Sequence, residues 1–293
     1  MELSDLNVFL AVARERSFSR AAEKLYRTQP AVSQALRRLE TWAGERLLER
    51  KARGILLTDA GEVLVEYAER MLNLRAEVKK SLADLTGLRR GKLSLGVNES
   101  SIHALLPVLA RYRKKYPQVH IGIQRTFSRD IPREVLNHRI DFGVISFEPQ
   151  DEKLTAVKIF RDELAFVVPP RHRLARRKSV SVKEASAEPF VAHIVESPFR
   201  WRVIRLFEKQ RVPLHMPVEL PTIESIKRFV QMGMGVAIVP RMCVEHELKQ
   251  GALVEVKIRQ MRMPRDLYLV HRSDARLSHA AQALYKMLRA GSE

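Results

Sequence analysis

Residues 28–40 read TQPAVSQALRRLE and combine a helix start with one apolar face and one polar face. Thr28 is expected to cap the helix, and Pro30 lies in the first turn, where a missing backbone N–H costs nothing. Val32, Leu36 and Leu39 recur at helical spacing, so they are predicted to face a core. The face left outside is short, polar and basic, and it carries Gln29, Ser33, Gln34, Arg37 and Arg38.

The preceding residues 17–27, SFSRAAEKLYR, predict another helix, joined to the first by a turn at residues 26–28. Ser19 is expected to cap it, and the small residues Ala21 and Ala22 allow a second helix to approach closely. The unit is therefore a helix-turn-helix. Amides and hydroxyls on its outer face can meet base edges, and guanidiniums can meet guanine or phosphate. The alternative is a three-helix scaffold whose polar face is only solvated.

Residues 45–58, ERLLERKARGILLT, predict a hairpin wing with a basic tip around Gly54. A basic tip of this kind is suited to following backbone phosphates. The cap, the small residues, the polar face and the wing all indicate the same function, so DNA binding is favoured over the scaffold. The basic residues of the wing are Arg46, Arg50, Lys51 and Arg53.

Four motifs together closely resemble the winged helix-turn-helix of the LysR-type transcriptional regulators: SFSRAA (17–22), TQPAVS (28–33), GERLLER (44–50) and LTDAGE (57–62). Two positions depart from the family pattern, because Ala43 stands where Leu is usual and Leu48 where Phe is usual. Both residues remain apolar. The residues expected to contact DNA are Thr28, Gln29, Pro30, Ser33, Gln34, Arg37, Arg38 and Arg53.

A long helix is predicted over residues 59–87, capped by Thr58, with apolar residues at seven-residue spacing. Such spacing is typical of a narrow seam against a second helix, although a helix packed on its own domain is the alternative. The resemblance also implies that this helix dimerises two DNA-binding domains. The expected dimer seam is Leu64, Tyr67, Met71, Leu74, Val78 and Leu85, with Ser81 interrupting the series.

Strands and helices alternate from residue 91 onward, which predicts an α/β domain with a mainly parallel sheet. Helix N-termini at strand ends form a crevice suited to carboxylate or phosphate. The resemblance implies a two-lobed effector domain like a type 2 periplasmic binding protein, with the ligand between the lobes. The expected effector-binding residues are Ser100, Ser101, Thr126, Ser128, His193, Ser197, Phe199, Arg200 and Thr222, although each alone is more often a cap or loop residue.

The expected domains are a DNA-binding domain (1–58), a linker helix with hinge (59–90) and an effector domain (91–293). Lobe one is expected at about 92–161 plus 267–293, and lobe two at about 162–266. The net charge of +18 suggests a polyanion or anionic ligands. However, residues 1–58 carry a net +4, residues 59–90 are neutral, and residues 91–293 carry +14. Charge therefore does not locate the DNA site, while Arg200 and the basic effector domain favour an anionic effector.

Enzymatic and metal-binding motifs are not recognisable in the sequence. It has no P-loop, no G-x-S-x-G and no G-x-G-x-x-G motif. Cys243 and His246 form a lone pair without further ligands, so no metal or cofactor is expected. The single cysteine cannot form an internal disulfide, and no export signal or spanning segment is recognisable, so a cytoplasmic protein is expected.

These observations predict a LysR-type transcriptional regulator that is not an enzyme. Its expected partners are double-stranded DNA with an interrupted dyad, a small effector of anionic type, and further copies of itself as homodimer or homotetramer. RNA polymerase is a further candidate partner, and no membrane is expected. The alternative is a two-lobed ligand-binding protein or enzyme whose N-terminal helices serve assembly only.

Overall fold

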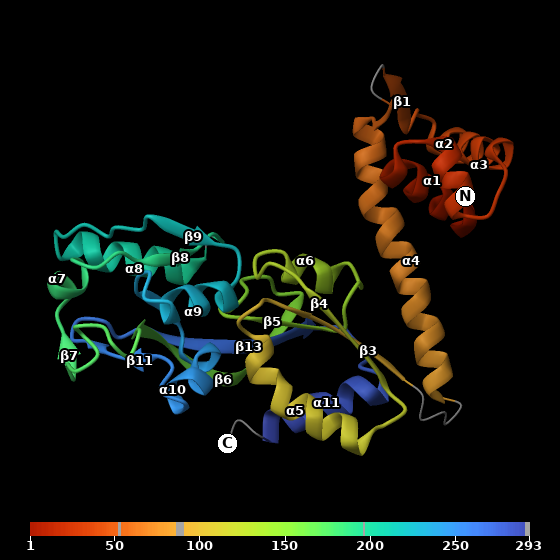
Figure 1. Ribbon diagram of the computed structural model, residues 1–293. Coiled ribbons are helices and arrows are strands. Elements are labelled where there is room, and N and C mark those ends of the chain that lie inside the picture. Colours follow the sequence, from red (N-terminus) through yellow and green to blue (C-terminus); the bar gives the residue numbers. More distant parts are fainter. Residues whose placement is uncertain (52–53, 86–90, 196, 291–293) are drawn as a thin grey trace.

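The computed structural model describes residues 1–51, 54–85, 91–195 and 197–290. A small helical domain stands at one end, a long helix leads away from it, and a larger α/β domain follows (Figure 1). The small domain packs its helices around buried side chains that include Phe9, Val32 and Leu39. Its elements are α1 (Leu3–Glu15), α2 (Phe18–Lys24), α3 (Gln29–Ala43), β1 (Leu48–Lys51) and β2 (Gly54–Leu57).

The two predicted helix caps of the helix-turn-helix have different outcomes. Thr28 caps α3 as predicted, because its side chain accepts a hydrogen bond from the backbone N–H of Ala31 at 3.4 Å. Ser19 as the cap of α2 is wrong. The side chain of Ser17 accepts from the N–H of Arg20 instead, so α2 begins at Phe18.

Helix α4 (Asp59–Leu85) is capped by Thr58, as predicted, through a 3.0 Å hydrogen bond from the N–H of Gly61. At 1.5 Å per residue its 27 residues span about 40 Å. Gly61 packs very closely against the wing. A Cβ at this position would lie 2.1 Å from the carbonyl oxygen of Leu47, so only glycine fits without movement of the backbone.

Gly61→Ala is therefore expected to destabilise the protein by about 1–3 kcal/mol, the usual cost of overpacking a tight contact. Helix propensity alone predicts the opposite sign, since alanine in a helix is about 1 kcal/mol better than glycine. The sign of the change in unfolding free energy, measured by urea or thermal unfolding, therefore decides between the two effects. Glu66→Ala, at an exposed position of the same helix, is the control. Unchanged or raised stability of Gly61→Ala would contradict the prediction.

Lobe one of the α/β domain has a core of residues from four strands and two helices, including Leu95, Tyr112, Phe142 and Leu284. The C-terminal helix packs beside α5, where the hydroxyl of Tyr112 donates to the carbonyl of Ala280 at 2.9 Å. The elements of lobe one are β3 (Lys92–Val97), α5 (Ile102–Lys115), β4 (His120–Arg125), α6 (Ile131–Leu136), β5 (Phe142–Ile145) and α11 (His279–Ala290).

Lobe two lies at the far end of the domain from α4 (Figure 1). Its core includes Phe166, Phe190 and Phe207, whose rings pack at centroid distances of 5.7 and 5.5 Å. Its elements are β7 (Ser179–Val180), α7 (Val182–Ala185), β8 (Val191–His193), α8 (Pro198–Lys209), β9 (Val218–Leu220), α9 (Ile223–Gln231), β10 (Ala237–Pro240), the 3-10 turn η1 (Arg241–Cys243), α10 (Glu245–Lys249), β11 (Val254–Glu255) and β12 (Lys257–Ile258).

Two long strands join the lobes, β6 (Leu154–Val168) and β13 (Pro264–Arg272). They pair antiparallel, with a register shift between Leu267 and Tyr268. Within the seven-stranded sheet, in the order β10-β6-β13-β5-β3-β4 with β11 on β6, only β3 pairs in parallel, with β4 and β5. The prediction of a mainly parallel sheet is therefore wrong, because the two strands that cross between the lobes run antiparallel to their neighbours.

Candidate DNA-binding face and effector cleft

The outer face of α3 projects from the small domain with its polar side chains free. Gln29, Gln34 and Arg37 are exposed, and Ser33 is half-buried. None of the hydrogen bonds found among the described residues engages these four side chains. Pro30 is also exposed, and the hydroxyl of Thr28 is used as the helix cap. The face therefore offers amide, hydroxyl and guanidinium groups that no part of the described fold occupies.

Arg38 differs from this set, because its guanidinium binds an acidic side chain of α1. Its Nη2 lies 2.5 Å from Oδ1 of Asp5, whose carboxylate is almost fully buried. The pair joins α3 to α1. Arg38 therefore helps to hold the domain together, and its contact with DNA stays a prediction.

The wing is a two-stranded antiparallel hairpin of β1 and β2, with Leu48 paired to Leu57. Arg53 lies outside the described residues, and the side chains of Arg50 and Lys51 are likewise outside what the structure describes. One further residue was missed from the sequence. Tyr26 lies in the helix-turn-helix turn with a φ of 53°, and its side chain is 97% exposed. A tyrosine hydroxyl in that place is suited to a phosphate oxygen.

Exposed apolar side chains form a stripe along α4. Tyr67, Met71, Leu74 and Val78 belong to it, as the heptad spacing predicts, and all are at least 37% exposed. Leu64 is a correction, because it packs against the core of the small domain. The side chain of Leu85 lies outside the described residues. The stripe also includes Val63 and Leu82, which are 62% and 58% exposed.

Helix α4 also contacts lobe one through ionic pairs. Glu77 accepts from Nη2 of Arg272 at 2.7 Å, and its other oxygen lies 2.5 Å from Nδ1 of His138. Burial opposes ionisation of Glu77, but the hydrogen bonds from His138 and Arg272 outweigh it and lower the pKa of the carboxyl. Nearer the N-terminus of α4, Glu69 forms ion pairs with both Arg14 of α1 and Arg139 of lobe one. Both carboxylates thus tie α4 to the corner between α6 and β5.

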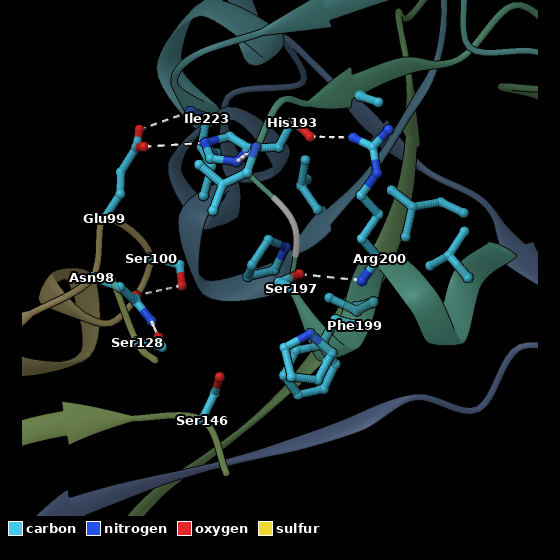
Figure 2. Close-up of a pocket in the computed structure, with 18 of the residues that line it drawn as sticks. Asn98, Glu99, Ser100, Ser128, Ser146, His193, Ser197, Phe199, Arg200 and Ile223 are labelled. Carbon is cyan, nitrogen blue, oxygen red and sulfur yellow. Dashed lines mark hydrogen bonds and ion pairs between the residues drawn. The ribbon is translucent and has the colours of Figure 1, made fainter. Parts of the chain in front are cut away.

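A cleft of about 750 Å³ lies between the two lobes, a volume usual for small-molecule sites. Figure 2 shows its polar rim. Two predicted residues do not line it. Ser101 is fully buried and its hydroxyl donates to the carbonyl of Asn98, while Thr222 caps α9. The predicted residues that do line it are Ser100, Thr126, Ser128, His193, Ser197, Phe199 and Arg200.

Asn98, at the end of β3, organises the lobe-one rim and was missed from the sequence. Its amide nitrogen donates to the hydroxyl of Ser128 at 2.5 Å, and its oxygen accepts from the hydroxyl of Ser100 at 2.9 Å. Figure 2 shows the three side chains together. Asparagine at a strand end reads as an ordinary turn residue, so the sequence carried no signal for this role.

Glu99 reaches from lobe one across the cleft to lobe two (Figure 2). One carboxylate oxygen accepts from the backbone N–H of Ile223 at 2.7 Å, at the start of α9. The other lies 3.4 Å from Nε2 of His193 and 3.1 Å from Nη2 of Arg125. A protein carboxylate therefore occupies the anion-attracting end of α9, and it joins the two lobes.

Arg200 lines the cleft, but its charge is already paired. The guanidinium donates to the carbonyl of His193 (Figure 2). It also donates to the carboxylate of Glu219. The hydroxyl of Ser197 caps α8 by accepting from the N–H of Arg200 at 3.2 Å. Arg200 therefore lines the cleft with its guanidinium already bound within lobe two, and its contact with an anionic effector stays a prediction.

Arg265, at the start of β13, is a buried cation in the cleft wall. Its side chain is 2% exposed, and its Nη1 lies 3.2 Å from Oδ2 of Asp162. Burial lowers the pKa of Arg265 and raises that of Asp162, each against the pull of the other charge. A second nitrogen donates to the hydroxyl of Ser100, while Nε is buried without a hydrogen-bond partner in the described structure.

Candidate metal ligands do not cluster within the described residues, where no group of three His, Cys, Asp or Glu is suitably placed. Cys243 is buried, and burial raises the pKa of its thiol to about 12. The thiol is therefore protonated at neutral pH and a poor nucleophile. No helix among the described residues is both long and apolar enough to cross a membrane.

Two family models match adjacent parts of the chain. The model described as a bacterial regulatory helix-turn-helix protein of the lysR family matches residues 3–62. The model described as the LysR substrate binding domain matches residues 86–293. A relative from Phaeodactylum tricornutum, named a probable RuBisCO transcriptional regulator, is 31% identical over 95% of this chain and 93% of its own length. A protein of the same name from Chlorokybus atmophyticus is 32% identical over 96% and 92%.

Solved structures share the fold at low identity. CbnR, a LysR family transcriptional regulator, covers 100% of both chains with a TM-score of 0.77 and 21% identity. The regulatory domain of Synechocystis PCC6803 CcmR, solved in complex with 2-PG, covers 70% of this chain and 98% of its own. Its TM-score is 0.63 at 22% identity. These likenesses establish the architecture, and the function of each site must be argued from its own residues.

Proposed function

The chain belongs to the lysR family of DNA-binding transcriptional regulators, and we propose that it binds an interrupted dyad operator as a homodimer or homotetramer. The observation that carries the DNA-binding part is the unengaged polar face of α3 on a helix-turn-helix. Gln29, Ser33, Gln34 and Arg37 would meet base edges in the major groove. Tyr26 and Arg53 would contact the phosphate backbone of the DNA next to those bases. Arg38 stays a predicted DNA contact, although its guanidinium also binds Asp5.

We further propose that the stripe on α4 forms the dimer seam, with Val63 in place of Leu64 and with Leu82 as a further member. Six half-exposed apolar side chains on one helix are costly in water and are suited to a matching helix. Two-fold pairing along α4 would place two α3 helices on successive major grooves. With domain limits at about residues 58 and 90, α4 lies between the DNA-binding domain and the effector domain, where it can pair with its copy.

The cleft between the lobes is proposed as the effector site, and α6 as its physical link to DNA. The segment before α6 lines the cleft with Phe127 and Ser128. The segment after it holds His138 and Arg139, which bind Glu77 and Glu69 of α4. A ligand that binds the segment before α6 would thus move the segment after it, against which α4 packs. The effector acts only to the extent that it binds one arrangement better than the other.

If effector binding changes the affinity for DNA, then DNA binding must change the affinity for effector by the same factor. The proposed connection through α6 can therefore be tested with DNA before the effector is identified. Operator DNA is taken from the region upstream of the protein's own gene that the bound protein protects. Its binding is expected to change the hydrogen-exchange rates of residues 126–131 in the native protein. A coupling of about 1–3 kcal/mol corresponds to a change of about 5- to 150-fold. Glu77→Ala is expected to reduce that change, because it removes the contacts to His138 and Arg272 and leaves only the Glu69–Arg139 pair.

The matched control is Glu66→Ala, also on α4, where the side chain is exposed and points to no described partner. It should respond to DNA like the native protein. Operator affinity of Glu77→Ala should stay within about threefold of native, since Glu77 lies outside α3. If Glu77→Ala retains the full DNA-dependent change at residues 126–131, α4 docking is not the route. If the native protein binds no upstream DNA in a salt-sensitive manner, the proposed function itself fails.

A further inference from the structure

The two walls of the cleft differ sharply in polarity. Lobe one contributes ten lining residues, and eight of them are polar or charged. Lobe two contributes 21, and 17 of them are apolar. Sites for compact, fully polar ligands need polar partners on all sides, because a polar group buried against an apolar wall loses its water without compensation. A cleft with one polar and one apolar wall is therefore suited to an effector that has both a polar and an apolar part.

The apolar wall is built between α8 and the strands of lobe two. Val203 and Ile204 lie on the cleft side of α8, and Leu214 and Met216 lie on the segment that leads to β9. Ile238 of β10 closes this part of the cleft. Apart from Ile204, these residues belong to the core around Phe190 and Phe207 or pack against it. It offers a preformed surface to an apolar group.

The polar wall offers hydrogen-bond donors that the described protein leaves unused. The hydroxyls of Thr126 and Ser146 have no partner among the described residues, and Figure 2 shows Ser146 standing alone. The hydroxyl of Ser128 accepts from Asn98 and keeps its own proton to donate. Beside them, the buried Nε of Arg265 has no acceptor. Three hydroxyls and a guanidinium that all line the cleft are suited to the oxygens of an acid group.

We propose that the effector is an organic acid with an apolar body, either an aromatic ring or an acyl chain of medium length. Its carboxylate would lie against Ser128, Ser146 and Arg265, and its body against Ile204 and Met216. This inference rests on the proposed function of the cleft as the effector site. A compact anion such as 2-PG would satisfy the donors but would leave the lobe-two wall in contact with water.

Calorimetric titration of the full-length protein tests the proposal with two series of probes. Straight-chain carboxylates from acetate to decanoate should bind about fourfold more tightly per added methylene, until the cleft is filled. Benzoate, phenylacetate and phenylpropionate test an aromatic ring in the same manner. The series that binds more tightly identifies the apolar body as a ring or an acyl chain. Primary amides of the tightest acids should bind at least about tenfold more weakly, since they lose charge-assisted hydrogen bonds.

Two variants on α8 place the apolar body. Ile204→Asn introduces a polar group into the cleft wall and should weaken the best acid by about tenfold or more. Leu206→Asn is the matched control, because Leu206 is equally half-buried on the same helix but does not line the cleft. It should leave acid binding within about twofold, while it reports any loss of stability from an asparagine on α8.

The remaining outcomes separate the failure of this inference from that of the proposed function. Tighter binding of 2-PG than of any apolar acid would overturn the inference and leave the cleft as the effector site. Equal affinity across both series, or an Ile204→Asn variant with native affinity, would overturn it as well. If no acid binds while operator binding is intact, the inference falls and the regulator stands. Absent operator binding by the native protein would instead remove the proposed function.

Discussion

Replacing Ser33 and Arg37 together by alanine is expected to weaken specific operator binding by on the order of 10²- to 10⁴-fold. Each base contact of this type contributes about 1–3 kcal/mol, and two are removed from every half-site. The fold should remain intact, since neither side chain forms a hydrogen bond within the described structure. Fluorescence anisotropy with operator and with unrelated DNA, at one fixed salt concentration, measures both affinity and specificity.

Two comparison variants sharpen this test. Thr41→Ala lies at the other end of α3, where the hydroxyl only donates to the carbonyl of Arg37, and it should bind operator like the native protein. Arg38→Ala should mainly lower stability, because the buried carboxylate of Asp5 loses its partner. Undiminished operator binding by the Ser33 and Arg37 double variant would show that this face of α3 does not read the bases.

The helix-turn-helix could be predicted in detail because its signals are local. Thr28, Pro30 and the spacing of Val32, Leu36 and Leu39 each depend on neighbours within two turns of one helix. The error at Ser19 shows the limit of such rules. Ser17 and Ser19 both satisfy the preference for a hydroxyl cap, and one residue of helix length decides between them. Phe18, the first residue of α2, packs against the domain core.

The cleft was predictable only at its rim. Serines and threonines at strand ends are local features, so most of the predicted set lines the cleft. The apolar wall is formed by residues from α8, β10 and the segment before β9, and each of these reads in sequence as an ordinary core position. Arg265 reads as a polar residue at the edge of a strand. Its burial against Asp162 and Ser100 arises only when β6 and β13 cross between the lobes.

The correction at Leu64 concerns which face of α4 is free. A seven-residue repeat places Leu64, Met71 and Val78 on one line, and sequence spacing alone treats these positions alike. The first turns of α4 pack against α1 and the wing, and that contact covers Leu64 while leaving Val63 exposed. Below them the free stripe follows the predicted positions from Tyr67 to Val78. The position of the small domain on α4 thus selects the residues left for pairing.

Leu74→Glu, at the centre of that stripe, is expected to dissociate the dimer and to lower operator affinity by on the order of 10²- to 10⁴-fold. The substitution places two carboxylates opposite each other across a two-fold seam, where like charges and desolvation both oppose pairing. The loss in affinity follows because a dimer presents its second α3 at high effective concentration once the first is bound. The single chain should fold normally, since Leu74 is 47% exposed in it.

Sedimentation velocity measures the assembly, and anisotropy with the full dyad and with one half-site measures the consequence for DNA. The native protein should prefer the dyad strongly, and Leu74→Glu should bind the two DNAs almost equally. Arg75→Glu, one position along α4 and on another face, introduces the same carboxylate side chain with a still larger change in charge, and it should remain a dimer. If Leu74→Glu stays dimeric and still prefers the dyad, the protein pairs through its effector domains, and the apolar stripe on α4 serves another contact.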